Sequence, residues 1–203
     1  TLNRMLSLTI NLPLGNALYA RDQMNVLLGK RIEASMKKPI RRPEVGLYNV
    51  IYERFLEPNN NIKIPIGERF EGGDAYVHNG IIYLGVGTRT SFGAAKHIFQ
   101  KLKPEIKQHG FEFAVVVDPK AFEKSSPAQM DSMHLDTFSM PAGPKQMLVC
   151  EEETCKRDVY IAKTNGDEVE FVNTDKSFLE FLVSQGEEII TLPKDEQINF
   201  GAN

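Results

Sequence analysis

Three short segments of the sequence carry acidic side chains, and one of them adds a histidine. Residues 18–22 end in Asp22, residues 71–74 read Glu-Gly-Gly-Asp, and residues 133–136 read Met-His-Leu-Asp. Of the four histidines, His134 is the one set tightly against an acid. Each segment alone is typical of a solvated turn, and residues 71–74 could be a plain loop before a hairpin. Their recurrence before equivalent elements of a repeat favours a shared site.

Several carboxylates and one imidazole suit a planar, cationic substrate with many donors. A guanidinium group offers five N–H bonds in a fixed plane, and carboxylates are its natural bidentate partners. Two aspartates could hold its nitrogens while the histidine moves protons, oriented by a further acid. A metal site is the alternative, with His134, Asp136, Glu71 and Asp74 as ligands, but their spacing matches no recognised ligand motif. We therefore expect no metal and no cofactor.

The chain has two cysteines, Cys150 and Cys155, too few for a disulfide framework. This predicts a reducing, cytoplasmic location. The acidic residues 151–153 lie between them and disfavour a thiolate, so neither cysteine is expected to act as a nucleophile.

The elements that position the acidic segments are predicted to repeat three times, as strand, strand, helix and strand. In the first unit they cover residues 25–28, 31–34, 43–56 and 61–66, with a turn at residues 29–30. In the second they cover residues 75–78, 81–84, 91–109 and 111–117, with a turn at residues 79–80. In the third we predict strands near 147–151 and 158–163, an extra strand at 168–172, a helix at 176–184 and a strand at 188–192.

Units of about 50 to 60 residues predict a repeat architecture of the α/β class. Residues 1–203 contain no linker or low-complexity tract, so we expect a single domain. If the units surround an axis, the three acidic segments converge on it.

Composition and charge narrow the functional class further. The chain has 203 residues and a mass of 22.9 kDa, with 41% hydrophobic and 25% charged residues, as in ordinary globular proteins. Its 24 Lys and Arg against 27 Asp and Glu give a net charge of −3, so we expect no nucleic-acid partner. Apolar stretches such as residues 113–117 are too short to cross a bilayer, so we expect no membrane association.

Five short motifs occur in the order found in arginine deiminases. They are Asn-Ala-Leu-Tyr-Ala-Arg-Asp at residues 16–22, Pro-Ile-Arg-Arg-Pro-Glu at 39–44, Glu-Gly-Gly-Asp at 71–74, Gly-Thr-Arg-Thr at 87–90 and Met-His-Leu-Asp-Thr at 133–137. From about Leu12 to Asn203 the chain thus resembles the guanidino-group-modifying (amidinotransferase) superfamily. The resemblance implies an α/β-propeller (pentein) of five ββαβ blades, of which about three are present here.

The resemblance also implies a role for each motif residue. Asp22 and Asp136 match the aspartates that bind the substrate guanidinium, His134 matches the general acid/base, and Glu71 matches the acid that pairs with it. The residues implied to hold the rest of arginine are Asp74 at the substrate's end of the pocket, Arg41 and Arg89 at the α-carboxylate, and Asn16 as their polar partner. Because two arginines are adjacent, Arg42 is an alternative to Arg41.

The reaction implied by the resemblance converts arginine to citrulline and ammonia through a Cys-thiouronium intermediate. The family's cysteine lies in a Gly-rich segment near the C-terminus, and this chain ends before it. We therefore expect an incomplete fragment that is inactive alone and is completed by a missing segment or a second chain. A homo-oligomer stays open.

Other functions remain as alternatives. Residues 139–143, Ser-Met-Pro-Ala-Gly, resemble dimethylarginine dimethylaminohydrolase, but that enzyme does not keep an acid at the position of Asp136. An amidinotransferase would use the same cysteine, and agmatine deiminase is disfavoured if Arg41 and Arg89 bind a carboxylate. A catalytically dead binding module on the same scaffold is the non-enzyme alternative. A ribosome anti-association factor is disfavoured by the net charge.

Overall fold

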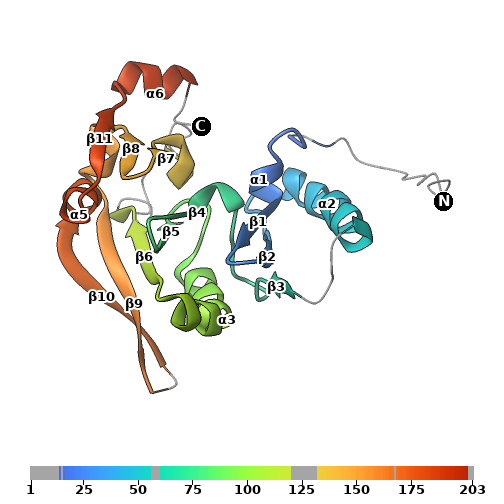
Figure 1. The fold of residues 1–203 in the computed structure, drawn as a ribbon. Coiled ribbons are helices and arrows are strands. Elements are labelled where there is room, and N and C mark those ends of the chain that lie inside the picture. Colours follow the sequence, from blue (N-terminus) through green and yellow to red (C-terminus); the bar gives the residue numbers. More distant parts are fainter. Residues whose placement is uncertain (1–13, 15, 56–59, 120–131, 167, 201–203) are drawn as a thin grey trace.

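The structure is a computed structural model, and it describes residues 14, 16–55, 60–119, 132–166 and 168–200. It is a mixed α/β fold in which three ββαβ units follow one another through these residues (Figure 1). In every unit the first two strands are antiparallel, and the last strand returns parallel to the second. The order strand, strand, helix and strand therefore recurs three times, as predicted, although the third unit uses other strands than those predicted.

The first unit is small and follows the prediction closely. Its elements are α1 (Ala20–Gln23), β1 (Met24–Leu27), β2 (Lys30–Glu33), η1 (Pro39–Arg41), α2 (Arg42–Phe55) and β3 (Asn61–Lys63). The hairpin turn lies one residue earlier than predicted, because Leu28 and Gly29 are the two residues with positive φ, 49° and 76°. Strand β3 ends at Lys63 rather than at residue 66.

The second unit matches the prediction nearly residue for residue. Its elements are η3 (Gly72–Asp74), β4 (Ala75–His78), β5 (Ile81–Val86), α3 (Phe92–His109) and β6 (Glu112–Val117). The side chain of Ser91 accepts a hydrogen bond from the backbone of Ala94 and so caps α3. Gly110, with a φ of 68°, ends this helix in the left-handed conformation that favours glycine.

The third unit departs from the predicted order. Its elements are η5 (Leu135–Thr137), β7 (Ser139–Gly143), β8 (Gln146–Val149), α5 (Phe178–Ser184) and β11 (Glu188–Thr191), with α6 (Lys194–Phe200) after them. Between β8 and α5 are inserted α4 (Glu151–Thr154), β9 (Asp158–Asn165) and β10 (Glu168–Ser177).

The predicted pairing of residues 147–151 with 158–163 is wrong. Strand β8 pairs with β7, whose proline and glycine hide the alternation typical of a strand. The β9–β10 hairpin instead pairs with β6 of the second unit and extends that sheet to five strands, in the order β10-β9-β6-β5-β4. The extra strand predicted at residues 168–172 is longer and belongs to this insertion.

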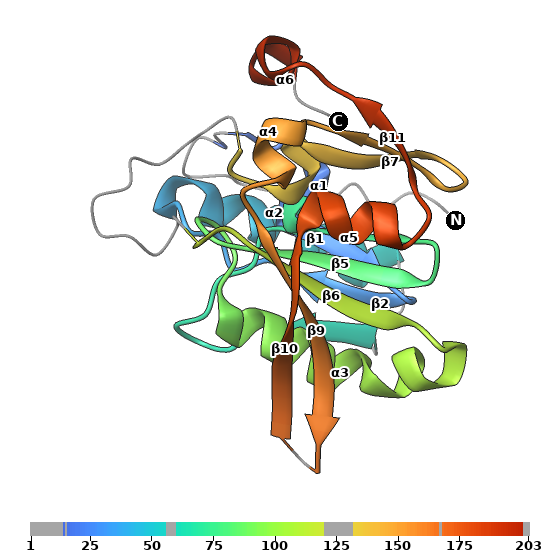
Figure 2. The same cartoon turned by 90° about the vertical axis from the view of Figure 1, so that its left-hand side faces the viewer.

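The five-stranded sheet is covered on both faces. Figure 2 shows α3 on one side of it. On the other side lie α5 and the three-stranded sheet of the third unit, in the order β11-β8-β7. All six residues of β5 are buried. Its side chains alternate between two apolar clusters, with Ile82 and Leu84 facing α3, and Tyr83 packed with Phe178 of α5. This packing joins the second and third units.

No sheet closes on itself among the described residues. Within the same residues, no helix is both long enough and apolar enough to cross a bilayer.

Candidate active site

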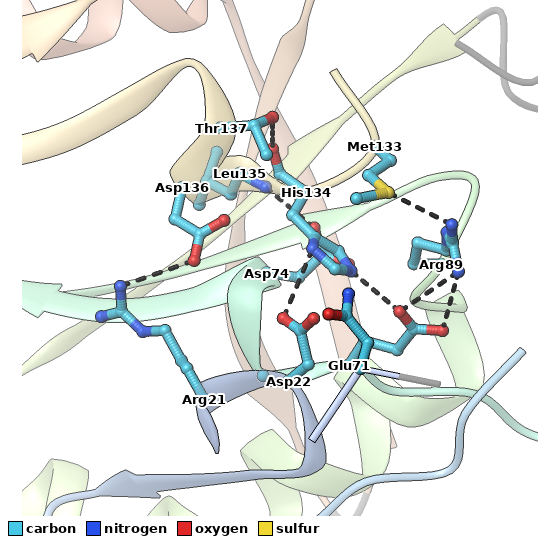
Figure 3. Close-up of polar contacts among 12 residues, drawn as sticks. Arg21, Asp22, Glu71, Asp74, Arg89, Met133, His134, Leu135, Asp136 and Thr137 are labelled. Atoms are coloured by element: carbon cyan, nitrogen blue, oxygen red, sulfur yellow. Dashed lines mark hydrogen bonds and ion pairs between the residues drawn. The ribbon is translucent and has the colours of Figure 1, made fainter. Parts of the chain in front are cut away.

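The three acidic segments lie together in space. Segment 18–22 runs into α1, segment 71–74 forms η3, and segment 133–136 leads into η5, and each directly precedes the first strand of its unit. Helix η3 contacts both α1 and η5. The convergence predicted from the repeat is therefore present, and Figure 3 shows its polar side chains.

Two glycines allow this close approach. A Cβ at Gly73 would lie 2.8 Å from Nδ1 of His134 and 3.0 Å from an oxygen of Asp136, and a Cβ at Gly72 would collide with the backbone oxygen of Arg21. The side chain of Asn25 fixes the same loop by donating to the backbone oxygen of Gly72 over 2.6 Å. Any side chain at these glycines would push the segments apart.

His134 lies between two carboxylates. Its Nε2 is 2.9 Å from Oε2 of Glu71, and its Nδ1 is 3.5 Å from Oδ1 of Asp22 (Figure 3). Burial opposes the charged imidazole, but the hydrogen bond with Glu71 and the charges of Asp74 and Asp22 outweigh it and raise the pKa of His134 to about 9. The imidazole is therefore protonated at neutral pH.

Glu71 is the centre of a buried charge network. Besides His134, it lies 3.4 Å from Nη1 of Arg89 and accepts a hydrogen bond from the backbone of Lys37. Burial raises the pKa of Glu71, but the hydrogen bond with His134 and the charge of Arg89 together hold it below its usual value. Glu71 is thus an anion that can orient a protonated imidazole.

Asp74 lies on the inner side of the same segment. Its two oxygens accept hydrogen bonds from the hydroxyl of Thr90 over 2.6 Å and from the backbone N–H of Leu135 over 3.0 Å. Burial is the main cause that raises the pKa of Asp74 to about 7. The resemblance implies a place for Asp74 at the substrate's end of the pocket, and in the structure one of its oxygens also holds the backbone of the residue next to His134.

Arg41 faces the site, and its neighbour Arg42 does not. Nη1 of Arg41 donates to Asp22 over 2.7 Å, and its Nε donates to Glu44 over 3.1 Å. The exposed Arg42 donates to a backbone oxygen instead. Between the two alternatives, Arg41 is the one in contact with a site aspartate. Asn16 takes part through its backbone, because its oxygen accepts from Arg41 and its N–H donates to Glu44.

Glu44 is a site residue that the sequence analysis missed. It binds Arg41 and also accepts from the side chain of Gln23 over 2.5 Å. The available signal was its place three residues after Arg41 at the start of a helix, where two side chains share a face.

Arg89 and Asp136 are the remaining residues of the predicted site. Nη2 of Arg89 lies 3.1 Å from the sulfur of Met133, beyond its contact with Glu71. Asp136 is buried, and its Oδ2 is 3.5 Å from Nη1 of Arg21. The sequence quoted Arg21 and Met133 as motif letters without giving either a role.

The two cysteines lie elsewhere. Cys150 is packed in the apolar cluster around Tyr83, and the thiol of Cys155 is exposed. Burial and the charges of Glu151 and Glu180 raise the pKa of Cys155. The raised pKa disfavours the thiolate form of Cys155.

No group of three or more His, Cys, Asp and Glu side chains has the geometry of a metal site within the described part of the chain. Three of the carboxylates near His134 are instead paired with arginines, Asp22 with Arg41, Glu71 with Arg89 and Asp136 with Arg21.

Known proteins resemble this chain in sequence pattern and in fold. A family profile described as arginine deiminase matches residues 6–203. No curated protein matches the chain significantly.

Solved structures with this fold include a dimethylarginine dimethylaminohydrolase in adduct with 4-chloro-2-hydroxymethylpyridine, with a TM-score of 0.60 and 19% identity over 91% of this chain and 58% of that one. The enzyme of the same name from Pseudomonas aeruginosa, a cysteine mutant complexed with citrulline, has a TM-score of 0.54 and 18% identity over 93% and 74%. An amidinotransferase of saxitoxin biosynthesis from Microseira wollei has a TM-score of 0.55 and 17% identity over 85% and 48%. The chain thus spans little more than half of the first of these proteins.

Proposed function

The chain belongs to the arginine deiminase family, and we propose that its acidic site binds the guanidinium group of arginine or of a related guanidino compound for hydrolysis of a C–N bond. The observation that carries the proposal is the imidazole of His134, held between Glu71 and Asp22 near the buried Asp136. Its pKa, raised to about 9, favours the protonated form. This arrangement joins a proton donor to carboxylates that match a planar cation.

In the proposed reaction, Asp22 and Asp136 hold the nitrogens of the guanidinium. A thiolate attacks its carbon, the C–S bond forms, and the C–N bond breaks with its electron pair leaving on ammonia. The imidazolium of His134 supplies the proton that ammonia takes. Neutral His134 then removes a proton from water, whose oxygen attacks the thiouronium carbon. The C–S bond breaks with its electron pair on the thiolate, the remaining hydroxyl proton of the adduct passes to solvent, where ammonia becomes ammonium, and citrulline is released.

We place the nucleophilic thiolate outside this chain. The burial of Cys150 in an apolar cluster and the raised pKa of Cys155 support this placement. We further propose that the three units belong to a single five-unit propeller domain, completed by a missing segment or a second chain. In this proposal the protein is cytoplasmic, in keeping with its two free thiols.

Arginine is the proposed substrate rather than a methylated arginine. Methyl groups would replace N–H donors that face Asp136, and a buried carboxylate that loses its donors is strongly destabilised. Arg89 and Arg41, with Asn16 beside Arg41, are proposed to hold the α-carboxylate, and Asp74 to fix the loop of His134.

The test is ammonia release by the completed protein from arginine, agmatine and asymmetrically dimethylated arginine. We expect turnover of arginine alone, and faster turnover of the dimethylated compound would favour the dimethylaminohydrolase alternative. Arginine binding without any ammonia release would favour a catalytically dead binding module.

A further inference from the structure

Arg21 brings a guanidinium group of the protein itself against a carboxylate of the site. Its Nη1 lies 3.5 Å from Oδ2 of Asp136 and 3.5 Å from the sulfur of Met140. The Arg21 side chain is 39% exposed, whereas that of Asp136 is 3% exposed. Figure 3 shows Arg21 reaching from its own segment toward Asp136.

We propose that Arg21 is an internal competitor of the substrate, so that its guanidinium occupies Asp136 in the free protein and moves away before a substrate guanidinium binds there. The inference rests on the proposed function, because it takes Asp136 as a ligand of the substrate cation.

The chemical match between the two cations is the first argument. A carboxylate as buried as Asp136 is costly unless a cation is near it. In the free protein the guanidinium of Arg21 meets this requirement, and a bound guanidino compound would meet it in the same way. Because the two groups are of one kind and carry one charge, they compete for the same carboxylate.

The ease of displacement is the second argument. Arg21 contacts Asp136 at the long distance of 3.5 Å, and its other acceptor is a thioether, which accepts hydrogen bonds only weakly. Its exposed side chain can return to water at little cost. When the Arg21 side chain moves away, the carboxylate of Asp136 therefore becomes accessible to a substrate guanidinium that fits it better.

Arg41 provides the contrast within the same site. It is buried and has three acceptors, at 2.7 Å on Asp22, 3.1 Å on Glu44 and 3.4 Å on the backbone oxygen of Asn16. So many short contacts make Arg41 a fixed part of the site. Of the two protein guanidinium groups on the expected substrate aspartates, Arg21 is the exchangeable one.

The test is calorimetric binding of L-arginine to the purified protein and to Arg21→Met, which keeps the apolar stem and removes the charge. We expect Arg21→Met to bind arginine about two- to fivefold more tightly, the range set by a partly exposed ion pair. In the completed enzyme the same change should appear in KM and not in kcat, which a merely structural loss would not produce.

Three further variants sharpen the experiment. Arg21→Lys should bind like the unchanged protein, because a cation still competes. Lys163→Met removes one charge from the exposed face of β9 and should leave arginine binding unchanged. Arg21→Gln replaces Arg21→Met if the latter does not fold.

The outcomes separate this inference from the proposed function. If Asp136→Asn weakens arginine binding while Arg21→Met and Arg21→Gln fail to strengthen it, Arg21 is not a competitor and the proposed function stands. If arginine binds neither the completed protein nor its Arg21→Met variant, the proposed function fails and the competition fails with it.

Discussion

At the scale of single residues, the site is a set of buried charges that neutralise one another. Glu71 contacts His134 and Arg89, and Asp22 contacts His134 and Arg41. Removing one member of such a network leaves its partner buried without compensation. Substitutions here should therefore be isosteric wherever chemistry and folding are to be told apart.

Replacement of His134 tests the proposed proton transfer. In the completed enzyme, His134→Gln should lower kcat for ammonia release from arginine by about a hundredfold or more, because the general acid and base is lost. Circular dichroism should show an unchanged fold. A variant that retains full activity would remove His134 from the mechanism.

The raised pKa of His134 predicts how stability depends on pH. Its folded pKa of about 9 lies above the ordinary histidine value of 6.5, so its contribution is complete below pH 6.5 and is lost as the pH rises through 9. Over this range the free energy of unfolding should fall by about 2 to 3 kcal/mol.

Urea denaturation at several pH values from 6 to 9.5 measures this effect. Asp74, with a pKa raised to about 7, adds a fall of its own up to about pH 8, so the interval from pH 8 to pH 9.5 reports His134. In His134→Gln the slope over that interval should flatten. An identical slope in both proteins would assign the pH dependence to other groups.

Arg89 tests the proposed carboxylate site. Arg89→Met, which keeps the apolar stem, should raise KM for arginine about tenfold or more, because it removes a charge-assisted hydrogen bond to the carboxylate. It should raise KM much less for agmatine, which lacks that group. Equal increases for both substrates would mean that Arg89 acts only through Glu71.

At the scale of elements, local sequence signals placed most of the helices and strands. The caps at Ser91 and Gly110 and the Asn79–Gly80 turn fix the second unit by contacts within a few residues. The error in the third unit concerned which strands pair, which depends on contacts between residues far apart in the chain. Strand β9 pairs with β6 across more than 40 residues, and no local pattern encodes that choice.

The difference between local signals and contacts far apart in the chain also applies to the candidate site. Motif residues could be listed from the sequence, and a repeat could predict that their segments converge. The partners Arg21 and Met133 could not be assigned, because their contacts with Asp136 and Arg89 join different units. The contact of Glu44 with Arg41 spans only three residues, so its spacing could have indicated it. Whether Arg41 or Arg42 faces the site likewise follows from the start of α2 rather than from residue type.

Gly73 tests the close approach of the segments. Gly73→Ala should destabilise the fold by about 1 to 3 kcal/mol, because the new Cβ would press on His134 and Asp136. It should also weaken arginine binding, which calorimetry measures alongside urea denaturation.

The matched control is Gly46→Ala in α2. A Cβ at Gly46 meets nothing within 4 Å, so this change should stabilise the fold by about 0.5 to 1 kcal/mol. If Gly73→Ala is as stable as this control and binds arginine as tightly, a Cβ fits between the segments and the close approach does not require glycine.

At the scale of the whole molecule, the second and third units share one apolar cluster. Phe178 of α5 is 0% exposed and its ring lies 5.8 Å from that of Tyr83 on β5. The side of the sheet opposite α3 is thus filled by side chains from the next unit. Neither unit can bury its apolar surface alone.

Phe178→Ala should therefore destabilise the described fold by about 3 to 5 kcal/mol through the cavity it leaves. Val183→Ala on the same helix, where the side chain is 57% exposed, should cost less than about 0.5 kcal/mol. Urea denaturation of both variants checks the difference. Similar losses in the two would mean that α5 contributes through its helicity and not through this packing.

The β9–β10 hairpin has a consequence for anyone who recombines these proteins. It is encoded within the third unit but completes the sheet of the second, so the boundary between two units in sequence is not a boundary in space. A chimera spliced between β6 and β7 would strip β6 of its neighbour and leave an unpaired strand edge open to aggregation. Exchange should instead move residues 72–191 as one cassette.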